Sequence, residues 1–565
     1  MTNDRSCVAS LVALIGLALE PRLCLAVDCN TDGLNGLNIA HLRAVSATLV
    51  PAVPPKQAYC DVKGSVSTEG EGAGPGSAGF EIMLPEHWNG KYMFSGVRGQ
   101  GGTLVSAASP TDLEQFMIKG YASVTSDQGH VSSDRKWYYA APGQGNMPQL
   151  VDYFYRAVHQ VTVATKDLVR AYYQSGAITH SYFDGCSNGG REAMMEAARY
   201  PEDYDGVISG STWLDPLGSA LADLKNVKAL INAPFPLSKL DEIDAAILAQ
   251  CDAADGVKDG LIQNPAACSF KPERLVPRVL TRQQAQALNI YLSAVRDQKG
   301  NLVFPGTPVS DLKMQFGVPN SRMVELDEPP SAPTAAQPWG KGEFPHLWAS
   351  ATGVILTLGF RDPSVDMNNT VEADGGVVRS DALATLYGRL RADMVDDPAR
   401  LKTYFGHGGK LILYHGLGDP IISPYSVVWF YEDLAAERGG YPAIQKDARL
   451  FLVPAMQHCS DGPTPTRFDT LTALEDWVEK GTPPDGIAST HMDGKTPDRS
   501  MPLCTFPEMA HYKGTGDVKD GQNWSCRPGD RSMLKTGSNG AQAGLNSRNR
   551  HTPFVRGTPS TDLGN

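Results

Sequence analysis

The chain has 565 residues, of which 41% are hydrophobic and 20% charged, and its formal net charge is -12 at pH 7. This length exceeds a single ordinary domain, and the composition is that of a water-soluble globular protein with a large core. No run of lysine and arginine stands out, which argues against a nucleic-acid or anionic membrane surface and leaves small neutral or aromatic molecules as candidate substrates. The sequence leaves the oligomeric state open.

Residues 1–26 resemble a signal peptide. The apolar stretch Val8–Leu19 is followed by small residues that suit cleavage after Ala26, and it is too short to span a bilayer. The alternative is a buried N-terminal helix, because Asp4 and Glu20 are unusual in a signal. We expect a secreted or periplasmic protein.

Cysteine usage supports export. Two of the ten cysteines lie within the expected signal peptide, and an even number remains after it. No two of the remaining cysteines have the CxxC spacing of a zinc or redox site. We therefore expect four disulfides formed in an oxidising compartment. The cysteines concerned are Cys29, Cys60, Cys186, Cys251, Cys268, Cys459, Cys504 and Cys526.

Between residues 80 and 215, short apolar runs alternate with helical stretches. This rhythm predicts a parallel sheet covered by helices, and it resumes after residue 410, so one sheet is interrupted and continued. The predicted class is α/β, an α/β-hydrolase fold with a large inserted lid domain. The expected strands are Lys91–Ser95, Ala122–Ser126, Ser181–Asp184, Gly206–Ser209, Lys410–His415 and Arg449–Val453, and the expected helices are Pro148–Tyr173 and Val427–Arg438.

The lid is predicted from a change of pattern between about Leu214 and Asn368. Amphipathic helices are expected at Leu240–Gln250 and Arg282–Ala294, and a proline-rich stretch follows them. The chain is expected to divide into a signal peptide at 1–26, a first hydrolase part at 27–213, the lid at 214–370, a second hydrolase part at 371–527 and a disordered polar tail at 528–565.

The candidate nucleophile is Ser187. Residues Gly185–Gly189 match the G-x-S-x-G turn, in which glycines allow a strained strand-to-helix connection that exposes the serine hydroxyl. The pentapeptide alone is a weak signal, but a strand is expected before it and a helix, Arg191–Ala198, after it. The alternative is a tight turn that carries no chemistry.

A serine hydroxyl needs a histidine base and an acid that orients the imidazole, and in this fold both follow the serine in the order acid, then histidine. Asp419 follows the strand at Lys410–His415, although it would also be explained as an aspartate that opens the Pro420 turn. His458 follows the last apolar strand, which makes it the candidate base. The rival histidines are His130, His407 and His415.

Two cysteines flank the candidate pair. Cys186 directly precedes Ser187, and Cys459 directly follows His458. If serine and histidine are hydrogen-bonded, these neighbours lie close enough for a disulfide, which would hold the pair in register. The alternative is two unrelated buried cysteines.

The oxyanion formed during ester hydrolysis needs two backbone donors. Asn188, the residue after the nucleophile, supplies the first. The second is expected in the glycine-rich segment Gly96–Gly102, where we favour Gly99. A flexible surface turn would explain the same glycines.

The segment Cys251–Leu261 predicts a calcium loop. Asp252, Asp255 and Asp259 place three carboxylates within eight residues, and glycines allow the chain to wrap around an ion. The spacing differs from that of an EF-hand, because the twelfth position is not acidic. Cys268 is expected to close the segment by pairing with its first cysteine. The alternative is an acidic solvated turn.

From Trp88 to Trp477 the sequence resembles the tannase and feruloyl esterase family, which also contains the bacterial hydrolase of terephthalate monoesters. The resemblance is carried by Trp88–Lys91, Ser126–His130, Cys186–Glu192, the Asp252 loop, Tyr414–Pro420 and His458–Cys459. It implies an α/β-hydrolase domain, a lid with a calcium site, and hydrolysis of aromatic acid esters through an acyl-enzyme. The resemblance also implies that calcium is bound by the side chains of Asp252, Asp255 and Asp259 and by the carbonyls of Val257 and Leu261.

Two departures from the family affect the substrate site. The segment Gly96–Gly99 contains Arg98 where the family usually has a denser glycine run, which leaves the second oxyanion donor and the local fit open. The lid has no family motif that identifies the acid. Its candidate ring or carboxylate ligands are Arg282, Arg322, Trp339, Phe344 and Trp348, although packing or a solvated charge is the simpler explanation of each.

The sequence therefore predicts a secreted serine carboxylesterase with a structural calcium ion, acting on a small-molecule aromatic ester of feruloyl, galloyl or terephthaloyl type. Two alternatives stay open. One is a serine peptidase on the same fold, and the other is a secreted calcium-dependent ligand-binding protein with an inactive hydrolase fold.

Overall fold

A computed structural model describes residues 27–529, apart from 132–136, 232, 234–236, 317–345 and 372–373. The expected signal peptide at 1–26 and nearly all of the expected tail lie outside the described residues, as do Arg322, Trp339 and Phe344 of the lid. Within the described part, no helix has the length and apolar character needed to cross a membrane.

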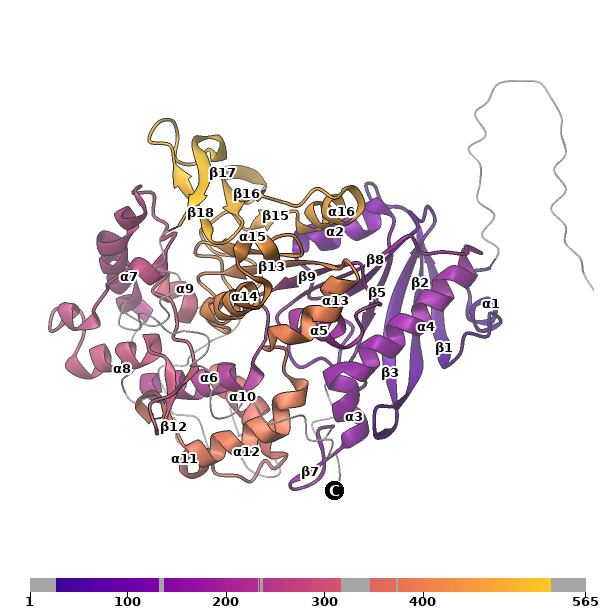
Figure 1. Cartoon of the computed structure of the whole chain (residues 1–565), viewed down its shortest axis with the longest axis horizontal. Coiled ribbons are helices and arrows are strands. Elements are labelled where there is room, and N and C mark those ends of the chain that lie inside the picture. The colour runs from indigo at the N-terminus through magenta and orange to yellow at the C-terminus, as the bar shows by residue number, and fades with distance from the viewer. Residues whose placement is uncertain are drawn as a thin grey trace, which may run out of the picture.

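A nine-stranded sheet forms the centre of the molecule, with strand order β1-β2-β3-β5-β4-β8-β9-β13-β14 (Figure 1). From β5 to β14 neighbouring strands pair in parallel. These strands are β4 (Lys91–Ser95), β5 (Ala122–Ser126), β8 (His180–Cys186), β9 (Gly206–Gly210), β13 (Lys410–Gly416) and β14 (Ala448–Val453). The prediction of an α/β-hydrolase sheet that stops after β9 and resumes at β13 is confirmed.

The other three strands extend the sheet in antiparallel fashion. They are β1 (Leu42–Val50), β2 (Tyr59–Gly70) and β3 (Ala73–Pro85), and β3 pairs with β5. The sequence analysis assigned no strands here. The strands carry many small and polar residues, and β2 and β3 bury alternate residues along much of their length, so their apolar signal is weaker than that of the central strands.

Helices cover both faces of the sheet. Successive side chains of a strand point to opposite faces, so neighbouring residues pack against different helices. Met93 of β4 packs in the cluster that includes α2 and α16, whereas Phe94 packs in the cluster that includes α4 and α5. The bounds are α2 (Pro110–Lys119), α3 (Met147–Val151), α4 (Ala157–Tyr172), α5 (Asn188–Arg199), α13 (Lys402–Gly406), α14 (Pro424–Arg438), α15 (Tyr441–Ile444) and α16 (Thr470–Lys480). A short helix α1 (Thr31–Asn35) precedes the sheet, and β6 (Tyr139–Ala141) and β7 (Gln144–Gly145) form a small hairpin.

The segment between β9 and β13 is largely helical, and Figure 1 shows it to one side of the sheet. Its helices are α6 (Pro216–Ile231), α7 (Leu237–Cys251), α8 (Arg282–Leu292), α9 (Leu312–Phe316), α10 (His346–Thr352), α11 (Met367–Thr370) and α12 (Ser380–Leu390). A small sheet joins β10 (Val295–Asp297) to β11 (Leu302–Phe304) and β12 (Val377–Val378). Because β12 belongs to this sheet, the inserted segment continues beyond the expected boundary at residue 370.

The last described segment forms antiparallel strands beside β14. They are β15 (Arg467–Phe468), β16 (Gly486–Asp493), β17 (Thr496–Cys504), β18 (Glu508–Tyr512) and β19 (Trp524–Pro528). The backbone N–H of Phe506 donates to the carbonyl of Leu450 at 2.8 Å, which fixes this region to β14.

All eight cysteines after the expected signal peptide are paired, so the prediction of four disulfides is confirmed. Cys186 pairs with Cys459 and Cys251 with Cys268, as the sequence predicted. The other two disulfides are Cys29–Cys60 and Cys504–Cys526.

Candidate active site

Ser187 lies in the turn between β8 and α5 with φ 64° and ψ -124°, a conformation that costs energy for any residue other than glycine. Its N–H donates to the carbonyl of Gly210 at 2.9 Å, which ties the turn to β9. A side chain at Gly185 would lie 2.4 Å from the carbonyl carbon of Gly189, so this close approach requires glycine. The turn has the strained geometry of a nucleophile elbow.

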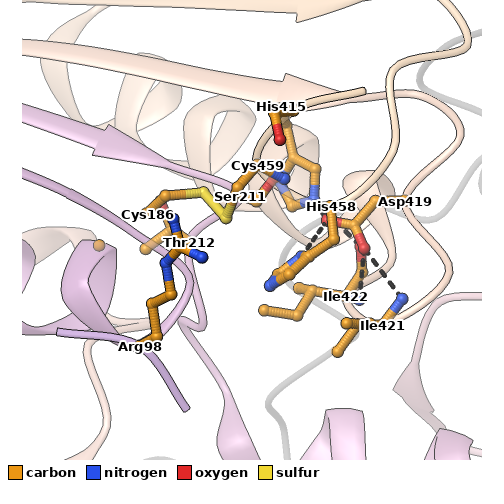
Figure 2. Close-up of a disulfide and its surroundings, with 12 residues drawn as sticks. Arg98, Cys186, Ser211, Thr212, His415, Asp419, Ile421, Ile422, His458 and Cys459 are labelled. Atoms are coloured by element: carbon orange, nitrogen blue, oxygen red, sulfur yellow. Dashed lines mark hydrogen bonds and ion pairs between the residues drawn. A yellow bond between two sulfur atoms is a disulfide. The ribbon is translucent and has the colours of Figure 1, made fainter. Parts of the chain in front are cut away.

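Asp419 follows β13 and is buried. Its Oδ1 accepts hydrogen bonds from the backbone N–H groups of Ile421 and Ile422 at 2.9 and 3.0 Å. Its Oδ2 lies 2.8 Å from Nδ1 of His458 and 3.1 Å from Nε2 of His415 (Figure 2). Asp419 therefore both shapes the turn and contacts the candidate base.

These contacts decide the charge of Asp419. Burial alone would raise the pKa of its carboxyl, but the charge of His458 and the hydrogen bonds from His415 and His458 hold the pKa well below its ordinary value. The carboxylate is thus ionised at neutral pH. An ionised Asp419 fixes the tautomer of His458 with the proton on Nδ1 and leaves Nε2 as the basic nitrogen.

Among the rival histidines, His415 also contacts Asp419. Its side chain is 0% exposed, whereas that of His458 is 18% exposed. His415 Nε2 also lies 3.0 Å from the carbonyl of Ile422, so this nitrogen holds the acid loop. His130 is buried and stacks on Trp137 with ring centroids 4.1 Å apart. Of the two histidines that contact Asp419, His458 is the one exposed to a substrate.

The Cys186–Cys459 disulfide brings the serine turn and the histidine loop together. The two cysteines are 273 residues apart in sequence, and their Cα atoms lie 5.9 Å apart. The N–H of Cys459 also lies 3.4 Å from Oγ of Ser211, at the end of β9. Among the described residues, no hydrogen bond joins the Ser187 hydroxyl to His458, and such contacts are often long before substrate binds.

The glycine-rich loop after β4 is anchored beside the first residue of α5. The N–H of Val97 donates to Oε1 of Glu192 at 3.3 Å, and Nδ2 of Asn188 donates to the carbonyl of Val97 at 3.4 Å. Gly99 itself is exposed and has φ 61°. The structure thus brings the loop to Asn188, while the oxyanion roles of Asn188 and Gly99 remain predictions.

A buried polar network that the sequence analysis missed lies behind this loop. Nδ2 of Asn188 donates to Oε1 of Gln128 at 2.9 Å and to Oε1 of Glu192 at 3.0 Å. Burial raises the pKa of Glu192 to about 8. Both Gln128 and Glu192 fall within the motifs of the family resemblance, but no pattern in the sequence shows that both side chains bond to Asn188.

The predicted calcium loop is a compact turn. Oδ1 of Asp252 accepts from the N–H of Asp259 at 3.1 Å, and Oδ1 of Asp255 accepts from the N–H of Val257 at 3.2 Å. Arg499 of β17 donates to Oδ2 of Asp259 at 3.2 Å and to its carbonyl at 2.8 Å. The loop is therefore fixed to the C-terminal strands.

The donor set of this loop fits a divalent cation. Burial, together with the charges of Asp259 and Asp252, raises the pKa of Asp255 to about 6. Among the described residues, one ion pair is found for these three carboxylates, between Arg499 and Asp259. The loop thus keeps excess negative charge and hard oxygen donors, which suit Ca²⁺.

Comparison with known proteins places these features in context. A family model for tannase and feruloyl esterase matches residues 60–527. The mono(2-hydroxyethyl) terephthalate hydrolase of Piscinibacter sakaiensis is 30% identical over 547 residues, which cover 86% of this chain and 87% of that protein. A probable feruloyl esterase of Arthroderma benhamiae is 29% identical over 466 residues, covering 79% of this chain and 81% of that protein. The crystal structure of feruloyl esterase B from Aspergillus oryzae shares the fold, with a TM-score of 0.72 at 22% identity over 87% of this chain and 98% of that one.

Proposed function

The chain belongs to the tannase and feruloyl esterase family and is an ester hydrolase, and on that premise we propose that it is a secreted serine carboxylesterase for esters of aromatic or phenolic acids. The observation that carries the proposal is the 2.8 Å contact between Asp419 and His458, in a loop that a disulfide joins to the strained Ser187 turn. The relatives named for terephthalate and feruloyl esters support an aromatic acyl group.

In the proposed first step, Ser187 Oγ attacks the ester carbonyl carbon and its proton passes to Nε2 of His458. Asp419 stays ionised and stabilises the imidazolium through Nδ1. The carbonyl oxygen gains negative charge, which the N–H of Asn188 and a second N–H from the glycine-rich loop, at Gly99, stabilise.

The tetrahedral intermediate collapses when His458 returns the proton to the alkoxide oxygen, so that the alcohol leaves and the acyl group stays on Ser187. A water molecule then repeats the sequence. His458 takes a proton from the water, the resulting oxygen attacks the acyl carbon, and the proton returns to Ser187 as the carboxylic acid departs. The protons balance over the two half-reactions.

We assign calcium a structural role. Asp252, Asp255 and Asp259 would hold it by side chain, and Val257 and Leu261 by backbone carbonyl. The ion would neutralise the excess charge of the loop and so stabilise the lid against β17, whose Arg499 already contacts Asp259. The bond-making steps involve the triad and the oxyanion donors alone.

Secretion is part of the proposal. Four disulfides fit an oxidising compartment, and the resemblance of residues 1–26 to a signal peptide supports the same location.

The test is hydrolysis of methyl ferulate, methyl gallate, a terephthalate monoester and a p-nitrophenyl acyl ester by the wild type and by Ser187→Ala. Ser175→Ala, at a half-buried serine after α4, serves as the matched control. We expect turnover that Ser187→Ala abolishes and Ser175→Ala retains. Binding without turnover by folded protein would favour the ligand-binding alternative, and cleavage of peptides but not esters would favour the peptidase.

A further inference from the structure

Arg98 is an exposed cation on the glycine-rich loop between β4 and α2. Its Nε donates to the carbonyl of Ser106 at 3.2 Å, and residues Val97 and Ser106 form a β-bridge that closes the loop. No ion pair with a carboxylate is found for Arg98 in the part of the chain that the structure describes. The Nε atom of Arg98 is thus fixed, while the positive charge of its guanidinium is not neutralised by a carboxylate of the described chain.

The side chain of Arg98 lies near Cys186, the residue directly before the candidate nucleophile. Figure 2 shows it extending from its loop toward the Cys186–Cys459 disulfide, on the Cys186 side, with His458 on the other side. The preceding residue, Val97, contacts Asn188, which follows Ser187 directly. Arg98 therefore borders the place where the ester carbonyl is attacked.

An arginine in this position suits a specific kind of ligand. Its planar guanidinium matches the geometry of a carboxylate through two parallel hydrogen bonds. The chain carries a net charge of -12, so an uncompensated cation at the site is a local exception that attracts an anion.

We propose that Arg98 binds a carboxylate carried by the substrate and makes the enzyme prefer anionic esters. The inference rests on the proposed function and names a substrate class for the same site. The carboxylate can belong to the acid, as in a monoester of an aromatic dicarboxylic acid, or to the alcohol, as in an ester of a hydroxy acid.

The experiment compares two matched pairs of esters. Monomethyl terephthalate and methyl 4-carbamoylbenzoate differ in a charge on the acid, and feruloylquinate and its carboxamide differ in a charge on the alcohol. For each pair we measure the ratio of kcat/KM on the anionic ester to that on the neutral ester. The variants are Arg98→Gln and Arg98→Lys, with Arg43→Gln on the edge strand β1 as the control for removal of an exposed arginine.

In at least one pair, Arg98→Gln should lower the ratio by about 10- to 100-fold, the range expected for hydrogen bonds to a charged group. The loss should lie mainly in KM. Arg98→Lys should restore part of the ratio because it keeps the charge, and Arg43→Gln should leave the ratio as in the wild type. The pair that responds identifies which side of the ester carries the carboxylate. Added salt should reduce the wild-type preference.

Two results would overturn the inference while the proposed function stands. One is an equal loss on charged and neutral esters, which would mean that Arg98 acts on the oxyanion or on the fold. The other is an unchanged ratio in both pairs. If the wild type hydrolyses none of these esters, the proposed function fails instead. Calorimetry with terephthalate and with quinate then decides the inference, because equal affinities of the wild type and Arg98→Gln for both anions would contradict it.

Discussion

Removing the Cys186–Cys459 disulfide by a double substitution to alanine should reduce both stability and activity. The bridge closes a segment of 273 residues. In the chain-entropy model, such a closure stabilises the folded state by at most about 5 to 6 kcal/mol at 25 °C. The Cys504–Cys526 bridge closes 22 residues and is worth about 3 kcal/mol in the same model. The first double variant should therefore lose about 2 kcal/mol more in the free energy of unfolding than the second.

Urea unfolding of the two double variants measures that difference, and hydrolysis of a p-nitrophenyl ester at a temperature where both are folded measures activity. The bridge between the serine turn and the histidine loop holds groups that must stay aligned, and small misplacements of catalytic groups lower kcat by up to about 100-fold. The Cys504–Cys526 bridge joins β17 to β19 and no loop of the triad, so its removal should leave kcat close to the wild-type value. Equal kcat losses in both variants would refute the reasoning that the first bridge aligns the pair.

Three further perturbations test separate parts of the site. Asp419→Asn should lower kcat by about 10⁴-fold with little change in KM, because the amide favours the wrong tautomer of His458; steady-state kinetics measures it, and a loss confined to KM would contradict the assignment. Burial raises the pKa of Glu192 to about 8 from an ordinary 4.5. The stability that the protonated Glu192 side chain contributes is therefore fully present below pH 4.5 and is lost as the pH rises to 8, because the unfolded chain ionises first. Glu192→Gln should therefore gain in Tm relative to the wild type between pH 5 and 8, and a difference in Tm that stays constant with pH would count against this. Chelation of calcium should lower the Tm of the wild type by several degrees and that of Asp255→Asn by less, which differential scanning calorimetry measures; equal shifts would exclude this loop as the site.

The central strands were predictable from the sequence because they are buried on both faces. The strands at Lys91–Ser95 and Ala122–Ser126 were expected with the bounds that the structure shows, since each is an apolar run between turn residues. The strands β1 to β3 were not predictable in this way. In β3 the residues Ala73–Gly79 are mostly small and only partly buried, so their pairing with β2 is set by the sheet rather than by local preference.

The candidate site was predictable to the extent that chain order and adjacent residues determine it. Ser187, Asp419 and His458 follow from the order of strands and loops, and the Cys186–Cys459 bridge follows from its neighbours. The contact of His415 with Asp419 was not predictable, because a lone histidine in a buried strand is more often structural. The hydrogen bond from Val97 to Glu192 depends on the packing of segments almost a hundred residues apart, which leaves no local pattern.

The location of the proposed calcium loop explains why loss of the ion should affect stability more than chemistry. Asp259 contacts Arg499 on β17, and β17 leads into the segment where Phe506 bonds to Leu450 of β14. The histidine loop begins where β14 ends, so the Asp252 loop is connected to His458 through the backbone of the edge strand β14. The Cys186–Cys459 bridge and the Asp419 contact hold His458 independently of that route. Chelation should therefore lower the free energy of unfolding while kcat at temperatures well below the Tm changes little.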